Sequence, residues 1–224
     1  MNNNQNEGGV LTTQRLEAFS DSVFAIVITL LFLDLRAPEI PHDSSWQELL
    51  GELYRLAPKF LSIIVSFTFV ALFWVAHHQF FHTLKQTTRG LLWLNLVFLF
   101  LVCFVPFPAA IMAEYPNNKT SVVFFGAAVL LTSLLLVALR WYAWIKHQEI
   151  SGVTEESEVR KALRRSCLMA FFYIAGIGVS FFFPLVAIVM YMLTPLMLLF
   201  PVKVNVEKEK QNDDKEQSEE EVKL

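Results

Sequence analysis

The sequence predicts an all-α integral membrane protein with six transmembrane helices. Of the 224 residues, 54% are hydrophobic and 21 are phenylalanine. The hydrophobic residues are gathered in long runs, and about 20 residues of helix are enough to cross a hydrocarbon core of roughly 30 Å. A soluble domain of this size does not carry such runs, so the composition excludes that class.

Six apolar segments divide the chain into a predicted membrane domain and two polar ends. We place the spans at about residues 14–35, 58–80, 90–112, 121–144, 166–183 and 184–200. The six-helix domain then covers residues 13–202 and follows a polar N-terminal segment, residues 1–12. Residues 203–224 carry mixed charge and no aromatic residue, which predicts a charged, disordered cytoplasmic tail.

The last two spans come from one apolar stretch that runs from Cys167 to Phe200. One helix of that length overshoots the hydrocarbon core, so we divide the stretch at Phe183 and Pro184. Five spans and an interfacial segment are the alternative, and they would place the tail on the other side. With six spans, most of the 18 lysines and arginines lie on the side of both termini, which predicts cytoplasmic N- and C-termini.

The first span carries polar residues at a depth where lipid does not tolerate them. Arg15, Glu17, Ser20 and Asp21 all lie within its first turns. Ionisable residues at membrane depth normally face protein or a water-filled cavity. We therefore expect that this helix does not face lipid all round.

One side of this helix is a candidate pore lining. At about 100° per residue, that side collects Arg15, Phe19, Ser22, Ile26, Thr29, Leu30 and Leu33. Ser20 and Asp21 lie on its flanks, where they can bond to neighbouring helices. The alternative is that Ile26, Leu30 and Leu33 are ordinary helix-packing residues, because apolar residues at helical spacing usually belong to a core.

The start of this helix also carries a motif, Arg15-x-x-x-Phe19-Ser20-Asp21. Together with the apolar face that follows it, the motif resembles the signature of the transmembrane protein 175 family, the lysosomal potassium channel family with bacterial members. The resemblance implies a potassium-permeable cation channel of modest selectivity. It further implies a homotetramer in which the first helix lines a central pore, K⁺ as the permeant ion without a cofactor, and the bacterial inner (plasma) membrane as its location.

The resemblance assigns roles along the pore face. Ile26 is implied as the narrowest constriction, with Leu30 and Leu33 as further apolar rings. Thr29 matches a hydroxyl position linked to potassium preference, and we expect Asp34 to concentrate cations near the outer mouth. The chain lacks the Thr-Val-Gly-Tyr-Gly loop whose carbonyls select K⁺ in other channels, so any selectivity must come from side chains.

Three residues of later spans are expected to brace the first helix. Trp74 and His77 lie near the end of the second span, and Asn95 lies inside the third. A lone amide in hydrocarbon seeks a partner on another helix. The resemblance implies that all three join a network with the motif residues Arg15, Phe19, Ser20 and Asp21.

The histidines that end the second span have several possible uses. They can bind a metal, carry protons or sit at the membrane interface. His77 and His78 point about 100° apart on a helix, so they do not suit one metal, whereas the spacing of His78 and His82 suits it better. We predict bracing by His77 and no metal, with an interfacial histidine pair as the alternative.

The motifs of common enzymes are missing from the sequence. It contains no Gly-rich phosphate loop, His-Glu-x-x-His, Gly-x-Ser-x-Gly or Cys-x-x-Cys. The set Ser20, Asp21 and His77 does not suit catalysis, because adjacent side chains on a helix diverge and we expect Arg15 to hold Asp21 as an ion-paired carboxylate. We therefore predict that the chain is not an enzyme and that its partners are further copies of itself, the lipid bilayer and K⁺, with no nucleic acid.

Two other functions stay open at this point. One is a proton channel or proton-coupled transporter that uses Asp21 and His77. Transporters usually show internal repeats and broken helices with a midplane site, and neither is evident in this sequence. The other is a scaffold that conducts no ions.

Overall fold

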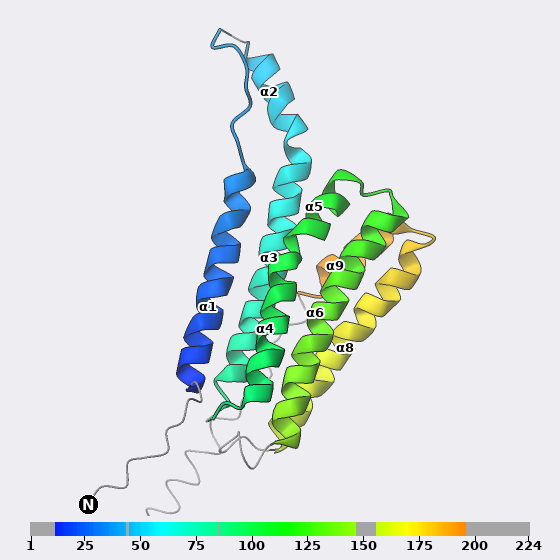
Figure 1. The fold of residues 1–224 in the computed structure, drawn as a ribbon. Coiled ribbons are helices and arrows are strands. Elements are labelled where there is room, and N and C mark those ends of the chain that lie inside the picture. Colours follow the sequence, from blue (N-terminus) through cyan, green and yellow to red (C-terminus); the bar gives the residue numbers. More distant parts are fainter. Residues whose placement is uncertain (1–11, 44, 85, 147–155, 196–224) are drawn as a thin grey trace, which may run out of the picture.

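The computed structural model describes residues 12–43, 45–84, 86–146 and 156–195 (Figure 1). Its elements are α1 (Thr13–Leu30), the 3-10 turn η1 (Leu31–Asp34), α2 (Trp46–Arg55), α3 (Ala57–Phe81), α4 (Arg89–Phe104), α5 (Pro106–Glu114), α6 (Lys119–Ile145), α8 (Glu156–Ser180) and α9 (Pro184–Leu193). The predicted all-helical class is confirmed. The predicted tail, residues 203–224, and nearly all of the N-terminal segment, residues 1–12, lie outside the described residues.

Four helices begin at a residue whose side chain accepts a hydrogen bond from a free backbone N–H group. The N-caps are Thr12 for α1, Ser45 for α2, Thr88 for α4 and Asn118 for α6. Ser45 forms a full capping box with Glu48, in which each side chain bonds to the other's backbone N–H. In α3, α5 and α9 a proline occupies the first or second position, where its missing N–H is not needed.

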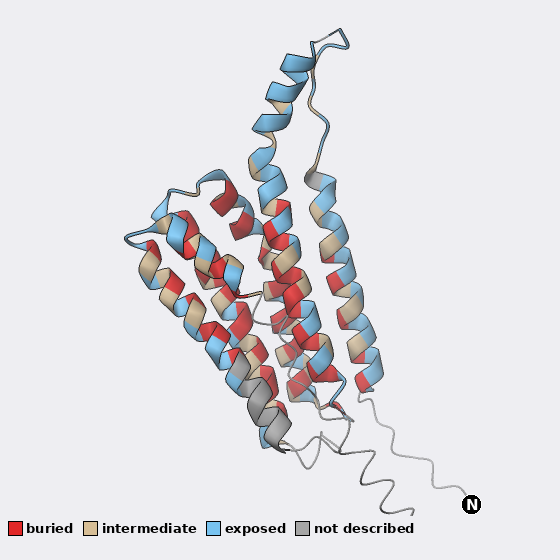
Figure 2. Ribbon diagram, turned by 180° about the vertical axis from the view of Figure 1, so that it is seen from behind, coloured by how far each residue is buried: buried red, intermediate tan, exposed pale blue. Residues whose placement is uncertain are grey.

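The helices form a bundle with α1 at one edge (Figure 1). α1 packs against α3 and α4, while α6 contacts α4, α5, α8 and α9. α2 continues beyond α3, projects out of the bundle and contains no buried residue (Figure 2). The arrangement leaves much of the first helix uncovered by its own chain.

Four helical segments are long and apolar enough to cross a membrane among the residues that the structure describes: Thr13–Leu33, Ala57–Phe81, Arg89–Glu114 and Lys119–Ile145. The third of these is interrupted at Val105, where α4 ends and the proline-rich α5 begins, as expected for a proline kink. In the first span only 22% of the most apolar window is buried, compared with 44–50% in the other three. The first span is therefore the least packed within one chain.

The final apolar stretch forms two shorter helices. α8 ends at Ser180, the chain turns, and α9 begins at Pro184 and packs back against α8 and α6. The apolar part of α8, Ser166–Ser180, and the ten residues of α9 span about 22 Å and 15 Å at 1.5 Å per residue. Each is shorter than the ~30 Å hydrocarbon core, so two full crossings remain a prediction.

An aromatic cluster joins α3, α6, α8 and α9 in the core. The ring of Phe69 lies 5.1 Å from Phe125 and 6.3 Å from Tyr173, and Tyr191 of α9 lies 5.8 Å from Phe125. All four side chains are fully buried. Tyr191 also lies so close to Gly126 of α6 that a Cβ atom there would collide with its hydroxyl group. Glycine at this position thus lets α9 dock on α6.

Candidate functional site

α1 has one buried face, which carries the polar motif into the bundle. Leu16, Ser20, Phe24 and Val27 are buried, and they recur every three or four residues. This spacing places them in one stripe along the helix. Because α1 contacts α3 and α4, the stripe is the surface that fixes the first helix to the bundle.

The opposite face of α1 is the predicted pore lining, and it is exposed in the single chain. The predicted lining residues are all exposed, namely Arg15, Phe19, Ser22, Ile26, Thr29 and Leu30 of α1 and Leu33 of the following turn η1. The exposed fractions of Ile26, Leu30 and Leu33 are 56%, 53% and 72%. These three aliphatic side chains are therefore not part of the core of one chain.

The hydroxyl group of Thr29 lies on this exposed face. It donates a 2.9 Å hydrogen bond to the backbone carbonyl of Ile26, one turn earlier. That bond uses the hydroxyl hydrogen and orients the group, while the oxygen keeps lone pairs that can face a cation. The side chain of Asp34 lies outside the described residues, so its role at the outer mouth stays a prediction.

Three buried polar side chains connect α1, α3 and α4. The Nδ2 group of Asn95 on α4 donates a 2.9 Å hydrogen bond to Ser20 Oγ on α1, and Asn95 Oδ1 lies 2.8 Å from His77 Nε2 on α3. Because Asn95 Oδ1 accepts, His77 Nε2 carries the proton in this arrangement. The Ser20 hydroxyl donates in turn to the carbonyl of Leu16 at 2.8 Å. The network thus runs in one direction from α3 through α4 to α1.

Aromatic rings enclose His77. The imidazole stacks on Phe81 and Phe98 at centroid distances of 4.2 Å and 5.5 Å, and Phe24 of α1 lies 5.6 Å away. The side chain is fully buried, and its Nδ1 atom has no hydrogen-bond partner within the described part of the chain. His77 is therefore held in one orientation by packing as well as by Asn95.

Asp21 lies beside this network and bonds to a different residue. Its Oδ1 atom accepts a 2.9 Å hydrogen bond from the indole Nε1–H of Trp74 on α3. Arg15 is exposed, and no ion pair joins it to Asp21, although both residues are described. The expectation that Asp21 is paired with Arg15 is not met within one chain, because Trp74 of the neighbouring helix takes that place.

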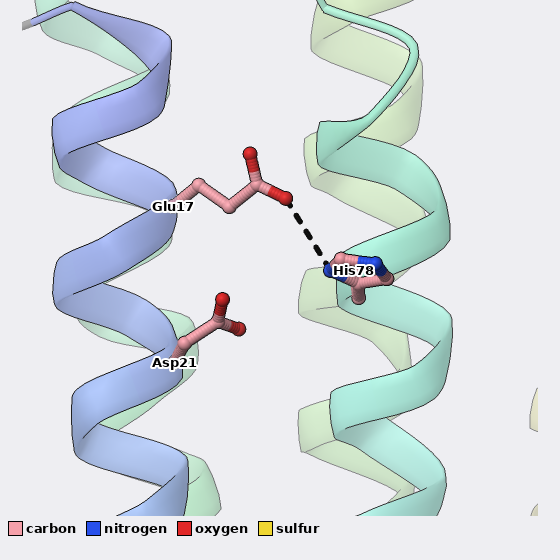
Figure 3. A group of neighbouring side chains, drawn as sticks. All are labelled: Glu17, Asp21 and His78. Atoms are coloured by element: carbon pink, nitrogen blue, oxygen red, sulfur yellow. Dashed lines mark ion pairs between the residues drawn. The ribbon is translucent and has the colours of Figure 1, made fainter.

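Two further titratable residues meet between α1 and α3. Glu17 and Asp21 lie one turn apart on α1 and both point toward His78 of α3, whose Nδ1 atom is 3.3 Å from Glu17 Oε1 (Figure 3). One possible ligand atom from each residue lies within 4.8 Å of the others. His82, which the sequence pairs with His78, is not part of this group, and the two rings are 6.4 Å apart.

A buried arginine is a further feature of this region that the sequence did not predict. Arg140 of α6 donates to the backbone carbonyl of Ala76 on α3 at 2.9 Å and also bonds to the hydroxyl of Ser166 on α8. It therefore ties α6 and α8 to α3 beside His77. Its signal in the sequence is a charged residue inside the apolar run of the fourth span.

The fold and this site define a multi-pass, all-helical membrane protein whose polar first-helix motif is tied to two other helices. Residues 15–106 match the model of the family described as endosomal/lysosomal potassium channel TMEM175. A potassium channel of Chryseobacterium sp. (strain P1-3) is 33% identical over 196 residues, which cover 86% of this chain and 95% of that protein. The endosomal/lysosomal proton channel TMEM175 of Mus musculus is 32% identical over 146 residues, 62% of this chain and 29% of that protein.

The crystal structure of a lysosomal potassium-selective channel TMEM175 homologue from Chamaesiphon minutus has the same fold. It superposes with a TM-score of 0.70 at 29% sequence identity and covers 84% of this chain and 96% of that one. The chain belongs to the TMEM175 family, which confirms the resemblance seen in the first-helix motif. Its relatives are ion channels rather than enzymes, and the chain is an ion channel of the same class.

Proposed function

We propose that the chain is a potassium-permeable cation channel of modest selectivity, with a pore lined by the α1 helices of four copies. The observation that carries this proposal is the exposed stripe of Ile26, Leu30 and Leu33 on the least buried of the four apolar spans. A bacterial relative that this chain covers almost completely is named a potassium channel. The stripe points to α1 as the helix that meets the ion path, and the name of the relative points to K⁺ as the ion.

Lipid is the other surface that an exposed aliphatic stripe can meet. The same exposed face, however, carries Arg15, Ser22 and Thr29. Polar groups that face lipid at membrane depth are costly, whereas the wall of a water-filled pore accepts them. The mixture of polar and aliphatic residues on one face therefore favours a pore.

Within the described part of the chain the first helix presents one such stripe, and one helix cannot enclose a path by itself. Copies related by a rotation axis would bring identical stripes together, and closed rotational symmetry is the usual arrangement of homo-oligomers. In a tetramer Ile26 would form the narrowest ring, a hydrophobic constriction that gates by losing its water. Thr29 would place four hydroxyl groups next to that ring, Leu30 and Leu33 would form wider rings, and Asp34 would lie at the mouth.

The topology completes the proposal. Six spans with cytoplasmic N- and C-termini keep most lysines and arginines on the inner side. The inner (plasma) membrane is the proposed location, K⁺ is the permeant ion, and no cofactor is needed, because a pore of this kind acts by size, wetting and side-chain oxygens. Ser20, Asp21, Trp74, His77 and Asn95 would hold α1 at the angle that the pore requires.

A proton pathway is the second candidate, because vertebrate relatives are named proton channels. Asp21 and His77 are the residues that would carry the proton. They belong to separate hydrogen-bond sets, since Asp21 bonds to Trp74 and His77 bonds to Asn95. The alternative therefore requires a link between the two sets, and it is not the better supported function.

The reversal potential of purified protein in planar bilayers separates these functions. With K⁺ on one side and Na⁺ on the other at equal pH, a potential shifted toward the K⁺ equilibrium value supports the proposal. A response only to a proton gradient would overturn it in favour of Asp21 and His77. Silence in both experiments would favour a scaffold, and native mass spectrometry of the same sample tests the tetramer.

A further inference from the structure

Glu17, Asp21 and His78 bring three metal-binding groups together between α1 and α3. Their ligand atoms lie within 4.8 Å of one another, and both carboxylates point from α1 toward the imidazole (Figure 3). Ligands of a tetrahedral Zn²⁺ at bond lengths of about 2.1 Å lie roughly 3.4 Å apart. A closure of at most about 1.4 Å, within reach of the flexible Glu17 side chain, would bring the three atoms to that spacing.

The Nδ1 atom of His78 is the second observation that points to a ligand. The His78 side chain is 45% exposed, but this atom is shielded from solvent and makes no hydrogen bond to any described residue. Glu17 Oε1 is 3.3 Å away, but the two groups are not aligned for a hydrogen bond. A shielded polar atom without a hydrogen bond is uncommon in folded proteins, and a bound ion is one of its ordinary explanations.

Trp74 orients two of the three groups. Its indole N–H donates to Asp21 Oδ1, and its ring stacks on His78 at a centroid distance of 5.6 Å and an angle of 22°. A carboxylate has two oxygens, so Asp21 Oδ2 stays available to a ligand while Oδ1 is held. Residues that fix metal ligands from behind in this way are a regular part of metal sites.

The charges at this position favour a cation. Two carboxylates one turn apart on a helix repel each other. Arg15, the nearest arginine along α1, is exposed and forms no ion pair with Glu17 or Asp21 among the described residues. The imidazole is the only group of this cluster that can balance the two negative charges, and a divalent ion would balance both.

We propose that Glu17, Asp21 and His78 form a binding site for a divalent transition-metal ion of the Zn²⁺ type, which links α1 to α3. One imidazole nitrogen and two carboxylate oxygens leave a fourth position for water. The nitrogen ligand selects against Ca²⁺ and Mg²⁺, which prefer oxygen ligands. The site concerns two helices of one chain, so it does not depend on which ion the pore conducts.

Calorimetric titration of the purified full-length chain with Zn²⁺ tests the proposal after a chelator has removed bound metal. We expect one Zn²⁺ per chain, and we expect Glu17→Gln and His78→Gln each to weaken binding by about tenfold or more. His82→Gln, one turn further along the same chain, and Glu48→Gln on α2 are the matched controls and should bind as the unchanged protein does. Ca²⁺ and Mg²⁺ should not bind at the concentrations that saturate Zn²⁺.

Absorption of bound Co²⁺ gives a second measurement on the unchanged protein. A four-coordinate site of this kind gives visible bands, which should be lost in His78→Gln and kept in His82→Gln. Circular dichroism and elution volume show whether each variant is folded, and if one ligand variant fails to fold, the other carries the test. The absence of saturable Zn²⁺ binding overturns the proposal. Zn²⁺ binding that survives both Glu17→Gln and His78→Gln also overturns it, because the metal then binds elsewhere and His78 only pairs with Glu17.

Discussion

Asn95 on α4 and His77 on α3 are joined by a 2.8 Å hydrogen bond between two fully buried side chains. The side-chain N–H group of Asn95 donates a hydrogen bond to Ser20 on α1. One amide thus serves three helices, and the direction of each bond follows from its single acceptor oxygen and its N–H donors. Through this amide, residues far apart in the chain fix the position of the helix that carries the proposed pore face.

Replacing Asn95 with alanine should destabilise the protein. The change leaves His77 Nε2 and Ser20 Oγ buried without their partner, and we expect a loss of about 1–3 kcal/mol in the free energy of unfolding. Thermal unfolding of the purified protein measures this loss. Asn117→Ala is the control, because Asn117 is exposed in the turn before α6. Equal unfolding temperatures for the two variants would contradict the bracing role of Asn95.

Replacing Trp74 with phenylalanine tests the bond between α3 and Asp21. The change keeps an aromatic ring on His78 but removes the N–H that Asp21 accepts, and we expect a loss of about 1–2 kcal/mol in stability. Trp93→Phe on the exposed side of α4 should change little. In a double-mutant cycle with Asp21→Leu, which removes the acceptor oxygen, the two losses should be less than additive, since both changes remove the same bond. Additive losses would show that Trp74 and Asp21 contribute independently.

Local sequence signals predict the helices themselves and the two faces of α1. Thr12, Ser45 and Thr88 are recognisable N-caps, and Pro184 marks the start of the last helix. Periodicity alone separates the exposed stripe of α1 from its buried stripe, because side chains one turn apart share a face. The family motif adds the prediction that Ser20 and Asp21 bond to neighbouring helices.

Partners on other helices cannot be predicted in this way, because they depend on how far one helix is shifted along another. The sequence pairs Asp21 with Arg15 and His78 with His82, which are near in the chain. In the structure Asp21 bonds to Trp74 and His78 faces Glu17, so tertiary packing decides both. Arg140 shows the same limit, since its acceptor is a backbone carbonyl that carries no signal in the sequence.

Replacing Gly126 with alanine tests the docking of α9 on α6. A Cβ atom at this position collides with the Tyr191 hydroxyl group, and overpacking of this kind costs about 1–3 kcal/mol. Gly178→Ala is the control, because no atom lies within 4 Å of its added Cβ, and it should be neutral or stabilising by up to about 1 kcal/mol. Adding Tyr191→Phe to Gly126→Ala should restore part of the loss. If the double variant is no more stable than Gly126→Ala alone, the strain does not come from contact with the Tyr191 hydroxyl group.

Replacing Thr29 with valine tests the hydroxyl group on the proposed pore face. Valine has the same shape without the oxygen, so the preference for K⁺ over Na⁺ should fall by about fivefold if the hydroxyl contributes about 1 kcal/mol. Thr29→Ser keeps the oxygen and should retain the preference. Reversal potentials under mixed K⁺ and Na⁺ conditions measure both variants. Thr68→Val on α3, where the hydroxyl also bonds to its own helix, should leave selectivity unchanged, and a change of the same size there would contradict the assignment.

Replacing Ile26 with asparagine tests the constriction. A polar ring would keep water in the narrowest part of the pore and remove the barrier that dewetting creates, so the leak conductance should rise. Ile64→Asn on α3 is the matched control, because its side chain has a similar exposed fraction, 62% compared with 56% for Ile26, but lies on a different helix. Current in planar bilayers, normalised to the amount of folded protein, compares the two. An unchanged current in Ile26→Asn, or an equal rise in Ile64→Asn, would remove Ile26 from the gate and leave its exposed stripe to face lipid.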